Sequence, residues 1–150
     1  MVCLGNICRS PMADGLLRKK VNDLQLAVEV DSAGTSGFHS GEQPDSRMRS
    51  VAKSLGVNID NLRARQFTEN DFREFDLIYA MDSSNYNNIL SLAKTDEDRS
   101  KVHLILNELN PGKNQQVPDP YYGGTEGFIE VFNLLDGATD KIIEKIRSNG

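Results

Sequence analysis

The chain has 150 residues and a mass of 16.7 kDa, which suits one domain with a single substantial core. With 38% hydrophobic and 26% charged residues, it falls outside the collagen-like, low-complexity and disordered classes. Its longest apolar runs have about five residues, whereas a membrane-spanning helix needs about 20. The 17 basic and 22 acidic residues give a net charge of −5, without a basic run that could follow a phosphate backbone. We therefore expect no membrane and no nucleic acid among its partners.

The cysteine content indicates a reducing compartment. Cys3 and Cys8 are too few for a disulfide framework, and no secretory-type signal opens the sequence. We therefore expect a cytoplasmic protein. No internal repeat and no Pro/Gly/Ser-rich linker divides the chain, so residues 1–150 are expected to form a single domain.

Short apolar runs alternate with helical patterns along the first part of the chain. Residues 1–3 are typical of the end of a strand, and Ser10 followed by Pro11 predicts the N-cap and first residue of a helix. Residues 27–31 alternate like a strand, and residues 34–44 are a Gly-rich loop. The first helix is predicted to bury the residues at three- and four-residue spacing, which are Leu16, Leu17, Val21 and Leu24.

Two further helices are predicted before the middle of the chain. The first covers residues 46–55 and is stopped by Gly56. The segment from Thr68 to Asp71 resembles a capping box with Asp in place of Glu or Gln, and it opens a short helix that ends at Phe75.

The second half continues the alternation. Residues 77–81 are typical of a fully buried strand, and Asp82 caps a helix that runs to about Lys94. Residues 102–106 form the next buried strand, and a long loop over residues 107–124 precedes a final helix from Thr125. One stripe of that helix carries Phe128, Val131, Phe132, Leu135, Ile142, Ile143 and Ile146.

Four strands separated by helices predict an α/β fold in which helices cover both faces of a parallel sheet. In such sheets, ligands bind beyond the carboxyl ends of the strands. The residues that directly follow a strand are therefore the candidates for a site. They are residues 3–10, residues 32–38, Asp82 and the loop that contains Asp119.

The segment from Cys3 to Ser10 combines a cysteine, five intervening residues, an arginine and a serine at a strand-to-helix junction. Such a loop can turn successive backbone N–H groups inward, and the helix adds its positive end, so the segment suits a tetrahedral anion. Arg9 adds a planar fork for two phosphate oxygens. The same donors would stabilise a thiolate on Cys3, the attacking form of a thiol. A helix terminus contributes only roughly 0.3–1 kcal/mol, so hydrogen bonds from the loop and the Ser10 hydroxyl are also needed.

Cleavage of a phosphate ester by a thiolate also needs an acid that protonates the leaving oxygen. Asp119 is our candidate, because Pro118 and Pro120 stiffen its loop and two aromatic residues, Tyr121 and Tyr122, follow and can enclose a substrate ring. Two plainer interpretations stand beside this one. Cys3 is then a small buried core residue, and Asp119 belongs to an ordinary Asp-Pro turn.

These residues together resemble the low-molecular-weight protein tyrosine phosphatase family, nearly end to end. The resemblance implies a flavodoxin-like fold, with a four-stranded, parallel, doubly wound sheet of strand order 2-1-3-4. It implies hydrolysis of protein phosphotyrosine and small aryl phosphates through a phosphocysteine, without metal or other cofactor, in a monomer or weak dimer that phosphate-like oxyanions inhibit. The blocks that follow the family pattern are CLGNICRSPMA (3–13), DSAGT (31–35), Pro44-Asp45, Ala64-Arg65-Gln66, Phe75-Asp76 with Met81-Asp82, and Asp119-Pro120-Tyr121-Tyr122.

The resemblance also implies roles for single residues. Cys3 would attack the phosphorus, Arg9 would clamp the phosphate, and Asp119 would protonate the leaving phenol and then activate water. Cys8 would trap an oxidised Cys3 as a reversible disulfide. The phosphate-binding loop would comprise Leu4, Gly5, Asn6, Ile7, Cys8 and Ser10, supported by Ser32 and Asp82; Leu4, Ile7, Phe38, Tyr121 and Tyr122 would line the slot for the substrate ring.

Two features depart from the family pattern. Family members usually have several apolar residues ahead of the nucleophile, whereas two residues precede Cys3, so we expect a truncated first strand. Leu62 stands where some members have a histidine that extends the polar network, so fewer hydrogen bonds are expected around the loop.

Several alternatives remain open. Arsenate reductases that resemble the family use an extra cysteine pair, and related arginine phosphatases tend to have threonine at the position of Ile7. A non-catalytic phosphate-binding module is a third alternative. His39 and His103 do not stand at a zinc-ligand spacing from the cysteines, so no metal site is expected.

Overall fold

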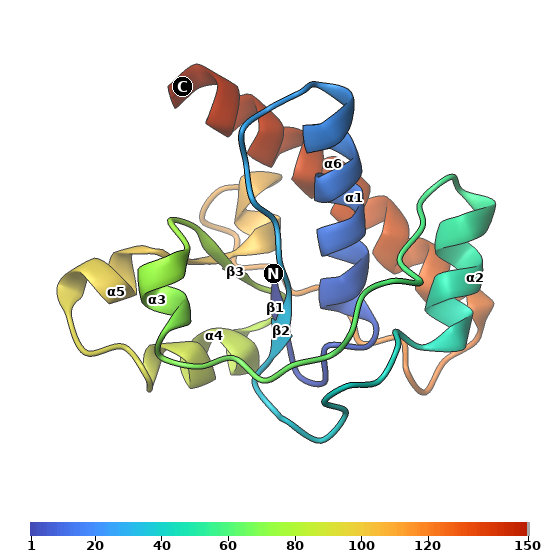
Figure 1. Ribbon diagram of the computed structural model, residues 1–150, viewed down its shortest axis with the longest axis horizontal. Helices are drawn as coiled ribbons and strands as arrows, with labels where there is room; N and C mark the ends of the chain where they lie inside the picture. Colours follow the sequence, from blue (N-terminus) through green and yellow to red (C-terminus); the bar gives the residue numbers. More distant parts are fainter. Residues whose placement is uncertain (150) are drawn as a thin grey trace.

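A computed structural model describes residues 1–149 of the chain. The α/β prediction is confirmed, because four parallel strands form one sheet in the order β2-β1-β3-β4 with helices on both sides (Figure 1). The strands are β1 (Val2–Cys3), β2 (Ala33–Gly34), β3 (Ile78–Ala80) and β4 (Val102–Leu104). β1 is central: Val2 pairs with Ala33 on one side and with Ala80 on the other.

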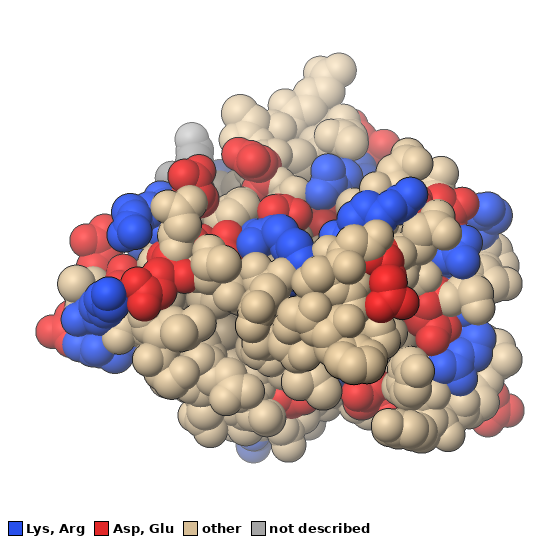
Figure 2. Space-filling model, turned by 60° about the horizontal axis from the view of Figure 1, so that its bottom comes forward, with Lys and Arg blue, Asp and Glu red and all other residues tan. Residues whose placement is uncertain are grey.

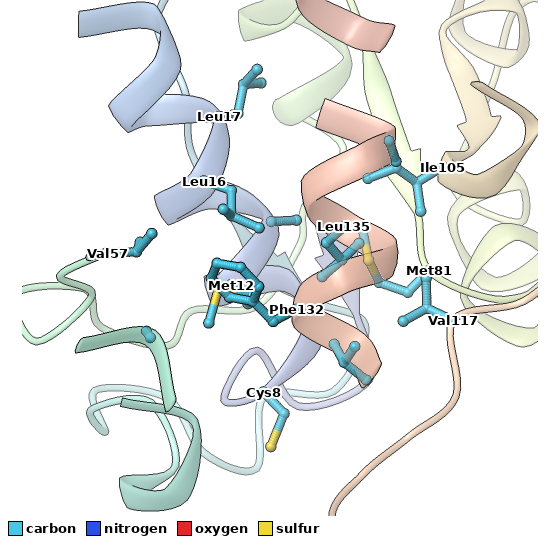
Figure 3. Packing of buried hydrophobic residues seen from close by; sticks show 14 of the residues in the cluster. Cys8, Met12, Leu16, Leu17, Val57, Met81, Ile105, Val117, Phe132 and Leu135 are labelled. Carbon is cyan, nitrogen blue, oxygen red and sulfur yellow. The ribbon is translucent and has the colours of Figure 1, made fainter. Parts of the chain in front are cut away.

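Helices α1 (Arg9–Asp23), α2 (Ser46–Ser54) and α6 (Thr125–Asn149) lie on one side of the sheet. Their apolar stripes form the larger core, in which α1 and α6 pack directly against each other (Figure 3). Met12 and Leu16 of α1 meet Phe132 and Leu135 of α6, and all four are buried. Burying each of these apolar side chains stabilises the folded state by roughly 1.5–3 kcal/mol.

The opposite face carries α3 (Asp71–Glu74), α4 (Ser83–Leu90) and α5 (Asp96–Ser100). A smaller core fills this side, formed by Val2, Ala33, Phe67, Phe72, Ile78, Ala80, Ile89, Val102 and Leu104. Successive residues of β3 alternate between the cores, since Ile78 and Ala80 belong to the smaller one and Tyr79 to the larger. Among residues 1–149, no helix joins the length and apolar character that crossing a membrane requires.

The predicted strand over residues 27–31 is wrong. The alternation is present, because Val28 and Val30 are partly buried against the larger core. However, the Val30 carbonyl accepts a hydrogen bond from the Arg18 guanidinium at 2.7 Å rather than from a neighbouring strand. The strand that pairs with β1 begins only at Ala33.

Other boundaries also differ from the predictions, and one helix was not predicted. The strand at 102–106 ends at Leu104, and a short 3-10 helix, η1 (Ile105–Glu108), follows it. The helix capped by Asp82 ends at Leu90 rather than near Lys94. The short helix α5, which the sequence analysis did not predict, is capped by the Thr95 side chain, which accepts a hydrogen bond from the Asp98 N–H at 3.0 Å.

Candidate active site

The segment between β1 and α1 lies at the carboxyl end of the sheet, together with the loop that follows β2 (Figure 1). We call residues 3–10 the phosphate loop. Helix α1 begins at Arg9, two residues before the predicted first helical residue Pro11, and Cys8 occupies the N-cap without a side-chain cap. The prediction of Ser10 as N-cap is therefore wrong. Its hydroxyl is turned inside the loop instead, where Ser10 is fully buried.

The Cys3 sulfur lies at the base of this loop and is buried. The Asn6 N–H donates a hydrogen bond to it at 3.2 Å, and the Ser10 hydroxyl lies 3.0 Å away. Both groups can donate a hydrogen bond to a negatively charged sulfur, and hydrogen bonds to a charged group contribute about 1.5–3 kcal/mol each. The N-terminus of α1 supplies a further favourable dipole.

Asn6 holds the loop in shape. Its φ of 57° is in the left-handed region, which Asn tolerates better than most residues. Its side-chain amide donates to the Ser10 hydroxyl at 2.8 Å and to the Ser32 hydroxyl at 3.0 Å. Its carbonyl oxygen accepts from the Arg65 backbone N–H at 3.1 Å. Through these hydrogen bonds, the Asn6 side chain connects Ser10 to the two segments that carry Ser32 and Arg65.

Gly34 of β2 makes the close packing of the loop possible. A Cβ atom at this position would lie 2.7 Å from the Leu4 carbonyl oxygen and 3.1 Å from the Asn6 nitrogen, so only glycine fits. The neighbouring backbone fixes the loop further, because the Thr35 N–H donates to the Cys3 carbonyl at 2.9 Å and the Ser36 N–H to the Leu4 carbonyl at 2.9 Å.

Arg9 lies at the centre of the site and is buried. Its guanidinium donates to the Asp82 carboxylate at 2.7 Å and to the Val117 carbonyl at 3.2 Å. Asp82 is itself fixed, because its other oxygen caps α4 through the Asn85 N–H. These contacts aim the planar fork of Arg9 from two directions, and the placement of Asp82 near Arg9 agrees with the expectation from the resemblance.

Asp119 lies on the loop before α6, near a different Arg9 nitrogen from the one that Asp82 binds. One of its carboxylate oxygens is 3.7 Å from an Arg9 nitrogen, and its side chain is 44% exposed. The other oxygen accepts a hydrogen bond from the Tyr121 N–H at 3.1 Å. The structure thus brings the two charged groups of the predicted chemistry, Arg9 and Asp119, into contact while leaving Asp119 accessible to a substrate.

The residues expected around a substrate ring lie at the surface. Leu4 is 50% exposed, Phe38 84% and Tyr122 94%, and Tyr121 packs edge-on against Tyr122 at 5.1 Å between ring centroids. Their part in a substrate slot stays a prediction. Figure 2 brings this end of the molecule forward: residues other than Lys, Arg, Asp and Glu cover most of its lower half, a few charged side chains lie among them, and more gather above and at the flanks.

Cys8 is buried where the larger core meets the phosphate loop, as Figure 3 shows. Burial raises the pKa of its thiol well above the ordinary value, and the nearby Asp45 carboxylate acts in the same direction. Both cysteines are free thiols. Cys8 is therefore held in the neutral form, unlike a group prepared for nucleophilic attack.

Both histidines contact residues other than the cysteines. The His39 ring pairs with the Glu42 carboxylate at 2.7 Å, at the edge of the loop after β2. His103 lies on β4 beside the Tyr79 ring, and partial burial together with Lys145 lowers its pKa. Within residues 1–149, no group of three or more His, Cys, Asp or Glu is arranged to hold a metal ion.

The sequence analysis missed several residues that shape the site. The Val117 carbonyl reaches Arg9, and the Val117 N–H donates to the Met81 carbonyl at 2.9 Å. Arg65 binds the carboxylates of Asp31 and Asp71 besides donating its backbone N–H to Asn6. Leu62, expected to weaken the polar network, packs against the larger core. A backbone N–H or carbonyl group that contacts the site leaves no local pattern in the sequence. Only the Ala64-Arg65-Gln66 block indicated the segment around Arg65.

A cavity of about 360 Å³ lies elsewhere, lined by residues that precede β2 and β3. Cys3, Arg9 and Asp119 do not border it. It therefore belongs to the amino end of the sheet, opposite to the candidate site.

Comparison with known proteins agrees with this geometry. A family model described as "Low molecular weight phosphotyrosine protein phosphatase" matches residues 1–150. The low molecular weight protein-tyrosine-phosphatase of Streptomyces coelicolor is 42% identical over 151 aligned positions, which cover 97% of this chain and 91% of the relative. A crystal structure of a protein tyrosine phosphatase from Entamoeba histolytica superposes with a TM-score of 0.92 at 40% identity, over 99% of this chain and 95% of the other.

A third match concerns a different phosphorylated residue. The crystal structure of a Drosophila arginine phosphatase superposes with a TM-score of 0.90 at 29% identity, over 99% of this chain and 97% of the other. The full-length match of the family model and the identity to its curated members lead to one assignment: the chain belongs to the low molecular weight phosphotyrosine protein phosphatase family.

Proposed function

We propose that this chain hydrolyses protein phosphotyrosine and small aryl phosphates, with Cys3 as nucleophile, Arg9 as phosphate clamp and Asp119 as general acid and base. The observation that carries the proposal is the grouping of a buried sulfur that accepts hydrogen bonds, a guanidinium aimed by Asp82, and a half-exposed carboxylate 3.7 Å from that guanidinium. Family membership supports the same activity.

In the first step, the Cys3 thiolate attacks the phosphorus and the bond from phosphorus to the tyrosine oxygen breaks. The protonated carboxyl group of Asp119 gives its proton to the departing phenolate, so that the dephosphorylated tyrosine side chain of the substrate leaves. Arg9 and the inward N–H groups of the phosphate loop hold the equatorial oxygens, whose charge has to be stabilised throughout the transfer.

In the second step, the Asp119 carboxylate takes a proton from water, whose oxygen attacks the phosphorus. The bond between sulfur and phosphorus breaks, which releases inorganic phosphate and restores the thiolate. Because the leaving group is the Cys3 sulfur, the Ser10 hydroxyl and the Asn6 N–H stabilise the charge that returns to it.

The nucleophile is tested by Cys3→Ser. A serine hydroxyl is far less ionised than a thiol at neutral pH, so we expect turnover of p-nitrophenyl phosphate to vanish while vanadate or phosphate still binds. Binding is measured by calorimetry and turnover by absorbance. Cys8→Ser, in the same loop, is the comparison: its buried neutral thiol is not assigned to the covalent step, so turnover should be reduced at most and not abolished. Retained turnover in Cys3→Ser would exclude the covalent route.

The acid is tested by Asp119→Asn. We expect kcat to fall by about 10²–10⁴-fold for aryl phosphates with poor leaving groups, because a phenolate of high basicity needs the proton most. Esters with good leaving groups should lose much less. A series of substituted phenyl phosphates gives this dependence directly. A loss that is equal across the series would argue against the acid role.

The substrate class is tested with peptides that carry phosphotyrosine, phosphoarginine or phosphoserine. We expect phosphotyrosine to be preferred, since the apolar side chains of Leu4, Phe38 and Tyr121 at the rim suit a flat aromatic ring. Preference for phosphoarginine would support the alternative activity that the name of the Drosophila relative describes.

The same site implies conditions for its use. Phosphate, vanadate and similar oxyanions are expected to inhibit by occupying the phosphate loop. The reaction requires Cys3 as a free thiol, so we infer that the protein acts in a reducing compartment such as the cytoplasm. Protein phosphotyrosine residues are its expected partners; nucleic acid and membranes are not.

A further inference from the structure

Arg47 of α2 packs against two aromatic rings next to the Asp119 loop. The central carbon of its guanidinium lies 4.7 Å from the centroid of the Phe128 ring and 5.4 Å from that of Tyr121. Phe128 is fully buried at the start of α6, so it forms the fixed side of the stack. Tyr121 is the exposed side, and it follows Asp119 by two residues.

Asp45 binds the edge of the Arg47 guanidinium and connects Arg47 to the phosphate loop. Its carboxylate accepts two hydrogen bonds from the Arg47 guanidinium, at 3.1 and 3.0 Å, and caps α2 through the Arg47 N–H at 2.8 Å. Its own backbone N–H donates to the Ile7 carbonyl of the phosphate loop at 2.7 Å. Arg47 is therefore fixed relative to the loop that carries Cys3.

On the far side of the stack, Tyr121 is joined directly to the acid. The Tyr121 N–H donates to an Asp119 carboxylate oxygen at 3.1 Å, which orients the carboxyl group. Before Asp119, Val117 is anchored to Met81 and to Arg9. After it, residues 120–124 have no helix or strand of their own, and the Arg47 stack is the side-chain contact that ties Tyr121 to α2 and α6.

We propose that Arg47 is a positioning residue for the reaction: it holds Tyr121, and through it Asp119, in place over the phosphate loop. The inference rests on the proposed acid role of Asp119. An unbroken series of contacts supports it, from the Ile7 carbonyl through Asp45, Arg47 and Tyr121 to the Asp119 carboxylate. Proton transfer to a leaving group depends on the placement of the acid to within a fraction of an ångström.

The stack needs arginine rather than lysine. A planar guanidinium can lie flat against a ring on each side while its edge makes two parallel hydrogen bonds to one carboxylate, and an ammonium group cannot do both. Arg47→Lys therefore keeps the charge but loses the planar guanidinium that packs against the rings of Tyr121 and Phe128.

The experiment is a double-mutant cycle between Arg47→Met and Asp119→Asn, measured with the same series of aryl phosphates. Because the stack is at the surface, we expect Arg47→Met to lower kcat for poor leaving groups by about three- to tenfold, and that for good leaving groups by less than about twofold. Inhibition by inorganic phosphate should stay unchanged, since the phosphate loop is intact. In the Asp119→Asn background, Arg47→Met should have no further effect.

Arg47→Lys should show the same selective loss in weaker form, which serves as the second variant. Lys53→Met is the control, because it removes a cation from the same helix that pairs with Asp60 rather than with a ring. Equal losses across the leaving groups, or an effect that persists undiminished in Asp119→Asn, would overturn the inference while leaving the proposed function intact. If Asp119→Asn itself shows no leaving-group dependence, both the acid role and the inference fail, and the Cys3→Ser result then decides on the nucleophile alone.

Discussion

Arg9 is bound by two carboxylates before any phosphate arrives. Asp82 contacts it at 2.7 Å and Asp119 at 3.7 Å. Buried cations need such partners, because an uncompensated charge in the interior costs several kcal/mol. The pairing with Asp82 also uses only one edge of the guanidinium, so the other nitrogen remains available to a phosphate once Asp119 turns toward the leaving group.

Asp14 of α1 shows the opposite situation, a buried carboxyl group that is only partly satisfied. One oxygen binds Arg18 at 2.9 Å, whereas the other has no hydrogen-bond partner among residues 1–149. Burial raises the pKa of Asp14 above its ordinary value of 3.8, although Arg18 opposes this shift. Relative to the unfolded chain, folding therefore favours the protonated form of Asp14, and the contribution of this group to stability is lost as pH rises from about 4 toward neutrality.

Asp14→Asn removes this titration. We expect the difference in melting temperature, variant minus wild type, to become more favourable to the variant as pH rises from 4 to 7. Thermal unfolding followed by circular dichroism at several pH values measures it. Asp23→Asn, at the exposed end of the same helix, is the control. A difference that shrinks with rising pH would contradict the assignment.

At the scale of the elements, the sequence predicts helices better than strands. The helices that begin near residues 46, 83 and 125 were predicted from caps and apolar stripes, which are local signals. The strand predicted at residues 27–31 is wrong, because its alternation reports only that one side packs on the core. Its backbone partners lie in other elements and leave no local signal, as with Arg18, which donates to the Val30 carbonyl.

The same distinction applies to the candidate site. The spacing of Cys3, Arg9 and Ser10 at a strand end is visible in the sequence, and so is the Pro-flanked Asp119. The contacts of the Val117 carbonyl and the Arg65 N–H are not, because every residue has these groups and only the tertiary fold directs them at the site. α5 could have been found, since Thr95 followed three residues later by Asp98 is a capping pattern.

Helix α1 is confined by a close approach at Gly15. A Cβ atom there would lie 2.4 Å from Cγ2 of Ile59 and 3.1 Å from Cγ1 of Val57. Alanine favours helices over glycine by about 1 kcal/mol, but overpacking a fixed core typically costs about 1–3 kcal/mol. We therefore expect Gly15→Ala to lower the free energy of unfolding in urea.

Gly137→Ala on α6 is the matched control. Its Cβ would meet the end of the Leu109 side chain at 3.3 Å, a neighbour that can move aside. We expect this variant to be neutral or more stable. If Gly15→Ala also gains stability, the segment around Ile59 is free to shift away from α1.

For the whole molecule, the site exists only when distant parts of the chain have come together. Cys3 ends β1 and Arg9 begins α1, Ser32 and Gly34 lie at β2, Asp82 follows β3, and Asp119 precedes α6. The parallel sheet places all of these at one end, as expected for doubly wound folds. No single segment supplies all of these groups. The resemblance over the full chain is therefore more informative than any one motif.

The end of the molecule brought forward in Figure 2 carries few charged side chains in its lower half, and this has a consequence for how a substrate first arrives. The chain carries a net charge of −5, and Arg9 is buried between carboxylates, so a phosphorylated protein meets mild repulsion at long range and attraction only after its ring has entered. Salt shortens the reach of that repulsion to about 8 Å at physiological ionic strength. Capture of acidic phosphoproteins should therefore quicken, rather than slow, as ionic strength rises.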